Sequence, residues 1–200
     1  MGRMRYGRRG PLSDECLWVK PADATVQYRS SLERGALNFR RASSGKILGG
    51  DWDLNTAPIG SSVKFKACMA HFRDGVPWEE TGLFEEMKAR IARDGVADGC
   101  RTYDDILARY AALDAVAEDA RRLGRLKARS ELPGHAFRRE HGGIFGHINR
   151  AGQFLRAGGG QHRFAMAKAL NLSLMPVQVG VIHAQAFEDG ALERLRAVQP

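Results

Sequence analysis

Hydrophobic and polar positions alternate along part of the last third of the chain. Ile144, Gly146 and Ile148 alternate with the residues between them, and this two-residue period predicts a strand. A turn at 150–152 follows, and residues 153–156 are predicted to pair back onto the first strand as a hairpin.

The spacing of apolar residues also predicts elements before and after the hairpin. Residues 161–170 predict a helix, the valine-rich segment 177–182 predicts a strand, and residues 186–197 predict a final helix. Nearer the N-terminus, short apolar runs at 16–19 and 46–49 predict two further strands.

The middle of the chain has the longer period of helices. Ser61 or Ser62 can cap a first helix, and Thr102 with Asp105 resembles the capping box of a later one. We therefore predict a helical insertion at about 61–140, between the first strands and the hairpin.

Together these elements predict an α+β fold, a small mixed sheet with packed helices, in a single domain over residues 16–200. The hydrophobic fraction of 44% supplies enough apolar residues for a core. Residues 1–15 have no apolar period and carry four arginines, so we predict a disordered basic tail there.

Composition narrows the class of protein. No run of about 18 apolar residues occurs, and the N-terminus lacks the apolar segment of a signal peptide, so we expect a cytoplasmic protein that does not span a membrane. Three widely spaced cysteines argue against a disulfide framework and against a cysteine zinc site. The net charge of +8 favours anionic partners, although a solvated basic tail is the simpler source of the excess.

A run of three glycines, Gly158 to Gly160, stands between the hairpin and the helix at 161–170. Glycine allows positive φ angles and close backbone approach, and the first turn of a helix offers free N–H groups at its positive dipole end. Arg163 could hold phosphate oxygens, and His162 could donate a hydrogen bond or transfer a proton. A tight turn with both side chains in solvent is the alternative.

The stretch Gly-Gly-Gly-Gln-His-Arg-Phe-Ala-Met-Ala-Lys-Ala-Leu, ending at Leu170, is followed by Met-Pro-Val-Gln-Val from Met175. This pattern resembles the ParB/sulfiredoxin superfamily, whose members open a helix with Gly-x-His-Arg or Gly-Glu-Arg-Arg and then enter an Ile-Pro-Val-type strand. The similarity covers about 40 residues, including the hairpin, and residues 17–21 resemble the family's first strand. It implies a ParB/sulfiredoxin-like sheet that is interrupted by the helical insertion.

The resemblance also implies a nucleotide-phosphate site. Sulfiredoxins bind ATP at this turn, partition ParB proteins bind CTP, and a related free-serine kinase uses ADP. The implied ligand is therefore ATP, ADP or CTP, with Mg²⁺ as the expected metal. The implied binding residues are Gly158, Gly159, Gly160, Gln161, His162 and Arg163.

Two departures limit what the family implies. Gln161 stands where sulfiredoxins have their catalytic cysteine, which disfavours reduction of a sulfinic acid. Only 17 residues follow His183, too few for the helix-turn-helix module of partition proteins. Segments at 49–53 and 77–82 are similar to segments of other bacterial proteins, which implies a distinct bacterial subfamily.

Candidate charged residues also lie outside the glycine run. Asp51 and Asp53 follow the strand at 46–49, and if that strand continued, both would lie on one face and could bind Mg²⁺ or activate an acceptor. Trp52 would then point into the core, and a polar turn is the alternative. Arg101 could bind a substrate phosphate or carboxylate, or lie on the surface.

Two functional hypotheses follow. In the first, the chain is a nucleotide-dependent phosphotransferase or nucleotide hydrolase acting on a small molecule, with Asp51, Asp53 and His162 as catalytic residues and Arg101 at the substrate. In the second, it is a non-catalytic nucleotide-gated switch or a nucleic-acid-binding module, and the missing helix-turn-helix disfavours nucleic acid. The sequence leaves the nucleotide, the acceptor, the metal and the oligomeric state open.

Overall fold

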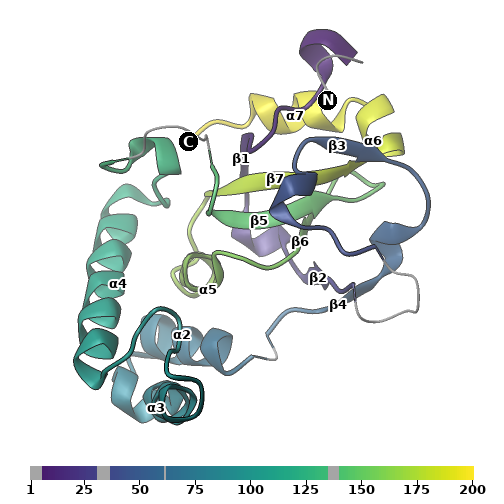
Figure 1. Ribbon diagram of the computed structural model, residues 1–200. Coiled ribbons are helices and arrows are strands. Elements are labelled where there is room, and N and C mark those ends of the chain that lie inside the picture. The colour runs from purple at the N-terminus through teal and green to yellow at the C-terminus, as the bar shows by residue number, and fades with distance from the viewer. Residues whose placement is uncertain (1–5, 31–36, 61, 135–139) are drawn as a thin grey trace.

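The computed structural model describes residues 6–30, 37–60, 62–134 and 140–200. These residues form an α+β fold in which seven strands make one mixed sheet (Figure 1). The strands are β1 (Cys16–Val19), β2 (Val26–Tyr28), β3 (Lys46–Leu48), β4 (Thr56–Pro58), β5 (Ile144–Ile148), β6 (Phe154–Arg156) and β7 (Met175–His183). The predicted fold class is confirmed.

The strands β7 and β5 form the centre of the sheet. All nine residues of β7 are buried, as its valine-rich composition requires of a strand covered on both faces. β7 runs parallel to β5, antiparallel to β1 and, at its far end, parallel to β3. β5 turns back into β6, and β2 and β4 complete the sheet beyond it. The predicted hairpin and the strand at 16–19 are confirmed.

Six α-helices and six short 3-10 turns occur in the described residues. The α-helices are α2 (Val63–Asp74), α3 (Leu83–Asp94), α4 (Tyr103–Leu123), α5 (Gln161–Ala169), α6 (Ala184–Glu188) and α7 (Ala191–Ala197). The 3-10 turns are η1 (Gly7–Arg9), η2 (Pro21–Asp23), η3 (Arg41–Ser43), η4 (Trp52–Leu54), η5 (Trp78–Thr81) and η6 (Arg129–Glu131).

The elements from α2 to η6 lie between β4 and β5 in the chain, and Figure 1 shows α2, α3 and α4 as a layer beyond α5. Local signals set the helix ends. Ser62 caps α2, Thr102 and Asp105 form the predicted capping box of α4, and glycines with positive φ end α2, α3 and α4.

The core lies on both sides of the sheet. α5 packs between the sheet and the helical layer, with Phe164 and Met166 fully buried beside Ile144 and Val177. In Figure 1, α6 and α7 lie on the opposite side of the sheet from α5. None of the described helices is both long enough and apolar enough to cross a membrane.

A smaller core cluster surrounds His147 with aromatic rings. The rings of Tyr28, Phe39, Trp52 and Phe145 each lie 5.0–5.6 Å from the imidazole, centroid to centroid. The Nδ1 of His147 accepts a hydrogen bond from a backbone amide of β7, and burial lowers the pKa of His147 to about 3. The histidine is therefore neutral and part of the packing. Trp52 is buried, as predicted.

The segment before β1 differs from its prediction. Residues 6–15 were expected in a disordered tail, yet Asp14 and Glu15 are buried, and the Glu15 carboxylate accepts hydrogen bonds from Arg196 of α7 at 2.6 and 3.0 Å. This distant ion pair, absent from any local pattern, holds the segment against the domain. Residues 1–5 of the expected tail lie outside the described residues.

Two element boundaries also differ. The helix predicted over 186–197 is divided into α6 and α7, because Gly190 adopts a φ of +73° between them. The strand predicted at 46–49 ends at Leu48, and the chain then enters the 3-10 turn η4. Asp51 and Asp53 therefore do not share a strand face, which corrects the geometry expected for them.

Candidate functional site

The glycine run forms a turn with positive φ throughout. φ is +96° at Gly158, +69° at Gly159 and +58° at Gly160, the residue that precedes α5. A Cβ on Gly160 would lie 2.7 Å from the backbone N and Cα of Ile144, and a Cβ on Gly159 would collide with the guanidinium of Arg41. Only glycine fits these two positions, so the turn can seat the start of α5 directly on β5.

His162 lies in the first turn of α5, but its side chain faces the helical layer. It is buried, and its Nε2 lies 3.0 Å from the Tyr110 hydroxyl oxygen of α4. Burial, followed by the charges of Lys64 and Arg109, lowers the pKa of His162 to about 4. A neutral imidazole paired within the core replaces the phosphate contact predicted for this residue.

Arg163 also points into the protein. Its Nη2 donates to the carbonyl oxygen of Lys127, and its Nη1 lies 3.7 Å from Oε1 of Glu140, a side chain with no exposed surface. Burial raises the pKa of Glu140, although the backbone N–H of Arg129 and the charge of Arg163 both oppose the shift. The guanidinium predicted to hold phosphate instead balances a buried carboxylate.

A small pocket lies beside the N-terminus of α5. Its volume is about 170 Å³, and we call it the arginine pocket. Among the binding residues predicted from the sequence, Gln161 alone lines it. The lining residues are Gln27, Arg29, Ile59, Gly60, Ser62, Phe65, Arg156 and Gln161.

Arg156 is the most informative residue of the arginine pocket. It ends β6, where it pairs with Gly146 on one side and with Gln27 of β2 on the other. Its side chain is buried, its guanidinium lies 5.1 Å from the ring centroid of Phe164, and its Nη1 donates to Gln27 Oε1 at 3.3 Å. Its Nε is buried with no hydrogen-bond partner among the described residues.

An unpartnered buried guanidinium N–H is costly. Burial lowers the pKa of Arg156, and no described carboxylate forms an ion pair with it. Arg163, by contrast, has the carboxylate of Glu140 3.7 Å from its Nη1. A negatively charged ligand would supply both the missing charge and the missing acceptor.

Two helix N-termini contribute to the same pocket. Ser62 caps α2 by accepting a hydrogen bond from the Phe65 amide at 3.2 Å, and it also accepts one from the Gln161 side chain at the start of α5. Gly160 caps α5 without a side-chain hydrogen bond. The first turns of both helices thus meet at the pocket, with their positive dipole ends close together.

The lining residues carry only positive charge. Arg29 and Arg156 are the two charged residues of the lining, and neither an aspartate nor a glutamate is among them. Ile59 and Phe65 supply an apolar wall, which strengthens electrostatic attraction by excluding water. The arrangement suits an anion with several oxygen acceptors.

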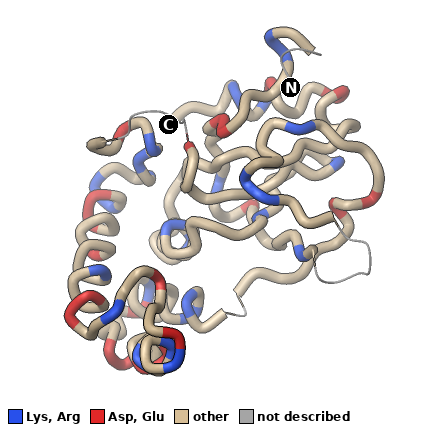
Figure 2. Tube along the Cα trace, in the orientation of Figure 1, with Lys and Arg blue, Asp and Glu red and all other residues tan. Residues whose placement is uncertain are grey.

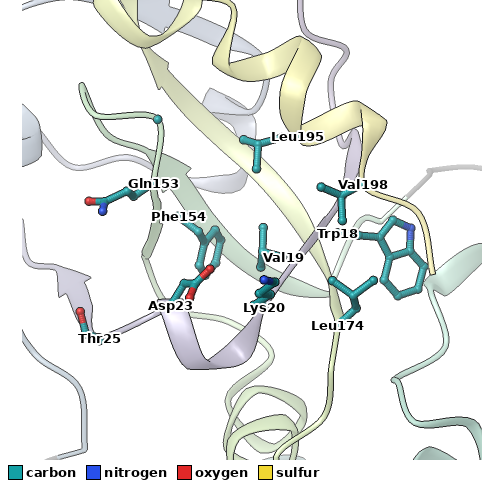
Figure 3. A pocket seen from close by; sticks show the side chains of 11 residues that line it. Trp18, Val19, Lys20, Asp23, Thr25, Gln153, Phe154, Leu174, Leu195 and Val198 are labelled. Carbon is teal, nitrogen blue, oxygen red and sulfur yellow. The ribbon is translucent and has the colours of Figure 1, made fainter.

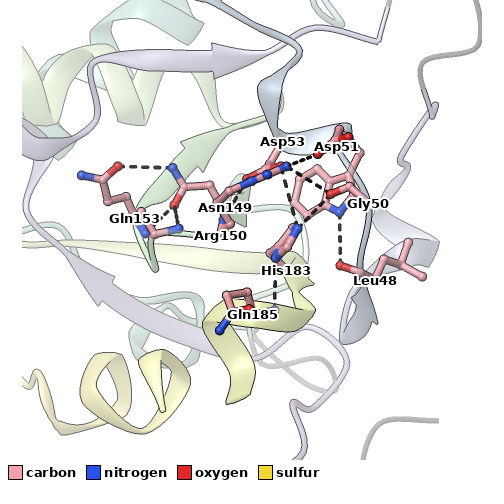
Figure 4. Close-up of polar contacts among 11 residues, drawn as sticks. Leu48, Gly50, Asp51, Asp53, Asn149, Arg150, Gln153, His183 and Gln185 are labelled. Atoms are coloured by element: carbon pink, nitrogen blue, oxygen red, sulfur yellow. Dashed lines mark hydrogen bonds and ion pairs between the residues drawn. The ribbon is translucent and has the colours of Figure 1, made fainter. Parts of the chain in front are cut away.

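Asp51 and Asp53 are brought together, but by Arg150 (Figure 4). The Arg150 side chain donates to both carboxylate oxygens of Asp53 and to Asp51 Oδ1, with distances of 2.7–3.1 Å. Burial alone would raise the pKa of Asp53, but the hydrogen bonds and charge of Arg150 outweigh it and lower that pKa. Because a guanidinium occupies the space between these carboxylates, they do not fit a Mg²⁺ site.

The aspartates also lie away from the arginine pocket. Arg150 follows β5, whereas Arg156 pairs with Gly146 inside β5. Position 150 lies two residues beyond the end of β5 at Ile148, and none of Asp51, Asp53 and Arg150 lines the arginine pocket. The described residues contain no group of three or more His, Cys, Asp or Glu side chains suited to a metal ion.

Arg101 lies exposed just before α4 and does not line the arginine pocket. Its backbone N–H donates to Asp105 Oδ2 at 2.9 Å, as part of the start of α4. The predicted substrate-binding residue therefore does not share the arginine pocket with Gln161.

A larger pocket of about 450 Å³ lies between β1, the β5–β6 turn and the C-terminal part of α7 (Figure 3). Its walls are largely apolar, including Trp18, Phe154 and Leu195, and its two charged residues, Lys20 and Asp23, have opposite signs. It lacks the concentrated positive charge of the arginine pocket, so we place the candidate anion site at the smaller one.

Sequence reasoning missed Arg156, Arg29 and Ser62 as partners in one site. The available signal was the strand period, since Arg156 is two residues from Phe154 and therefore on the same face of β6. A charged residue in register with a buried aromatic residue indicates a buried charge.

Comparison with known proteins finds no match to this chain among family models, curated proteins or solved structures.

Proposed function

We propose that this protein binds the phosphate groups of a nucleotide in the arginine pocket. The observation that carries the proposal is Arg156, a buried arginine that lines the pocket and whose Nε lacks a hydrogen-bond partner among the described residues. Arg29 and the first turns of α2 and α5 add positive charge around the same space.

The resemblance of the segment from Ile144 to His183 to ParB/sulfiredoxin proteins supports a nucleotide as the phosphate-bearing ligand. In this proposal the glycine turn acts indirectly. Gly159 and Gly160 place the N-terminus of α5 beside the pocket, while Gln161, Arg156 of β6 and Arg29, which follows β2, contact the phosphate.

Binding is better supported than phosphoryl transfer. Transfer needs a carboxylate or another group that activates the attacking oxygen, and often a metal ligand. None of the described residues that line the arginine pocket is a carboxylate, and Asp53 is committed to Arg150. We therefore propose a nucleotide-gated binding protein ahead of the phosphotransferase or nucleotide hydrolase considered from the sequence.

Titration calorimetry tests the proposal directly. ATP, ADP and CTP, each with Mg²⁺, are titrated into the wild type, into Arg156→Gln and into Arg122→Gln. Arg122 is a matched control, because its removal changes the net charge equally but affects only a surface pair with Asp119. We expect at least one nucleotide to bind the wild type and the control, and Arg156→Gln to bind about 10–100-fold more weakly, the loss of a charged hydrogen bond.

Two results would overturn the proposal. The first is no heat of binding with any of the three nucleotides, and the second is an equal affinity of wild type and Arg156→Gln. Nucleic-acid binding would instead give a gel shift that weakens steeply with salt and responds to Arg122→Gln as much as to Arg156→Gln.

A further inference from the structure

The charge of the arginine pocket indicates which kind of phosphate fits it. Arg29 and Arg156 contribute two positive charges, and two helix N-termini at roughly half a charge each bring the local total to about +3. A terminal phosphate carries about −1.5 to −2 at pH 7, whereas the phosphate of a diester carries about −1.

The size of the pocket also favours a terminal phosphate. A volume of about 170 Å³ is below the roughly 300–1,000 Å³ of sites that enclose a drug-sized ligand. At about 30 Å³ per water molecule, it corresponds to five or six waters, enough for a phosphate group and little more. The pocket can therefore take a phosphate group but not a whole nucleotide, and a diester would have to fit a substituent on each of two phosphate oxygens into the same small space.

The hydrogen-bond donors match a free phosphate end. Ser62 Oγ accepts two hydrogen bonds, from Phe65 and Gln161, which leaves its own proton to donate. Arg156 lines the pocket with a guanidinium whose Nε has no hydrogen-bond partner among the described residues. A terminal phosphate has three free oxygens to accept from such donors, while a diester has two.

We infer that the arginine pocket selects the terminal phosphate of a phosphomonoester or diphosphate over a phosphodiester. This inference rests on the proposed phosphate-binding function and specifies the group that enters. It separates the protein from one that binds the backbone of a nucleic acid.

A matched pair of ligands tests the inference: adenosine 5′-monophosphate and its cyclic 3′,5′-diester. The two share the base, the sugar and a single phosphorus, and differ in whether the phosphate has a free end. Inorganic pyrophosphate serves as a probe without a base. We expect the monophosphate and pyrophosphate to bind at least tenfold more tightly than the cyclic diester, and Arg156→Gln to abolish this difference while Arg122→Gln retains it.

The pH dependence adds a second readout. The second pKa of a phosphomonoester is near 6, so lowering the pH from 7.5 to 5.0 should weaken monophosphate binding about tenfold and leave the cyclic diester unchanged. The charged and titratable groups on the surrounding elements do not obscure this. His162, the titratable group of α5 nearest the pocket, remains neutral over this range because its pKa is about 4.

The outcomes distinguish this inference from the proposed function. Equal or tighter binding of the cyclic diester, with nucleotide binding intact, overturns the inference alone. If neither the nucleotides nor pyrophosphate bind the wild type, the proposed function fails, and the inference fails with it.

Discussion

The arginines at the two ends of the β5–β6 hairpin differ in their hydrogen-bond and ion-pair partners. At the turn, Arg150 is hydrogen-bonded to two carboxylates and to the Gly50 carbonyl oxygen (Figure 4). At the other end, Arg156 is buried with one long hydrogen bond to Gln27 and an Nε without a partner among the described residues. At the turn, carboxylates balance the arginine charge, whereas the pocket end has an excess of positive charge.

This difference separates an arginine whose charge is balanced within the protein from the one that we propose binds a ligand. Arg163, next to the pocket end, belongs with Arg150, because the buried Glu140 accompanies it. A nearby carboxylate, more than motif position, therefore separates the three, since Arg163 also has a buried Nη1 without a hydrogen bond among the described residues. The net charge is also unevenly distributed along the chain. Residues 62–134 contain 13 basic and 13 acidic residues, so the excess of +8 lies in the rest of the chain. Figure 2 shows both signs along α3 and α4.

The largest expected effect belongs to Arg163. Arg163→Ala leaves the Glu140 carboxylate buried without its counter-ion, so we expect a loss of about 3–5 kcal/mol in the free energy of unfolding, measured by urea denaturation. The paired replacement Arg163→Met with Glu140→Gln should recover most of it, because neither charge remains. Phosphate binding by folded Arg163→Ala that falls as far as in Arg156→Gln would contradict the comparison.

His162 should make stability depend on pH. Its pKa is about 4 in the folded protein against 6.5 for the free group, so the unfolded chain binds a proton that the folded chain does not. Stability should therefore fall as the pH drops from about 6.5 to 4, by up to about 3 kcal/mol from this residue.

His162→Gln should reduce the dependence of the free energy of unfolding on pH, measured from denaturation curves collected between pH 7 and pH 4.5. The remainder should persist, because His147 has a pKa of about 3 and contributes in the same direction. An unchanged slope in His162→Gln would show that the histidine is not held neutral by the core.

Removal of Arg150 should act on stability and leave phosphate binding intact. Arg150→Ala takes away the hydrogen bonds that hold the pKa of Asp53 low, and burial then raises that pKa. We expect a melting temperature roughly 5 °C lower at pH 7.

The sign of the pH dependence checks this account. In the wild type, Asp53 contributes stability above the unfolded pKa of 3.8, and this contribution is lost as the pH falls through its lower folded pKa. The difference between wild type and Arg150→Ala should therefore shrink between pH 7 and pH 3. A constant difference would mean that the Asp53 charge is not the cause.

Substitutions of Ser62 should have the smallest effect and give the most selective test. Ser62→Ala removes the cap of α2 and should cost about 1 kcal/mol of stability together with a few-fold loss of phosphate affinity. Ser62→Asp keeps a capping oxygen but adds negative charge to the pocket, so it should retain stability and abolish binding. Ser62→Asn is the neutral capping control, and equal binding by the Asp and Asn variants would contradict an anion site here.

The amino-acid sequence by itself determined the local elements. The alternation at Ile144 to Ile148, the capping box of Thr102 and Asp105 and the positive φ of the glycine run depend on neighbouring residues, and each is present in the structure. The break at Gly190 was also local, but the helical period on either side of it concealed the turn.

Only the tertiary structure decided which charges meet. Arg150 and Asp53 are 97 residues apart, and Arg163 lies in α5 whereas Glu140 lies in the loop before β5, so no local pattern could reveal that both arginines have carboxylate partners. Arg156 and Ser62 come together because α2 packs against α5 beside the end of β6. Pairing energies depend on distance in space and on exclusion of water, and both are set when distant segments pack.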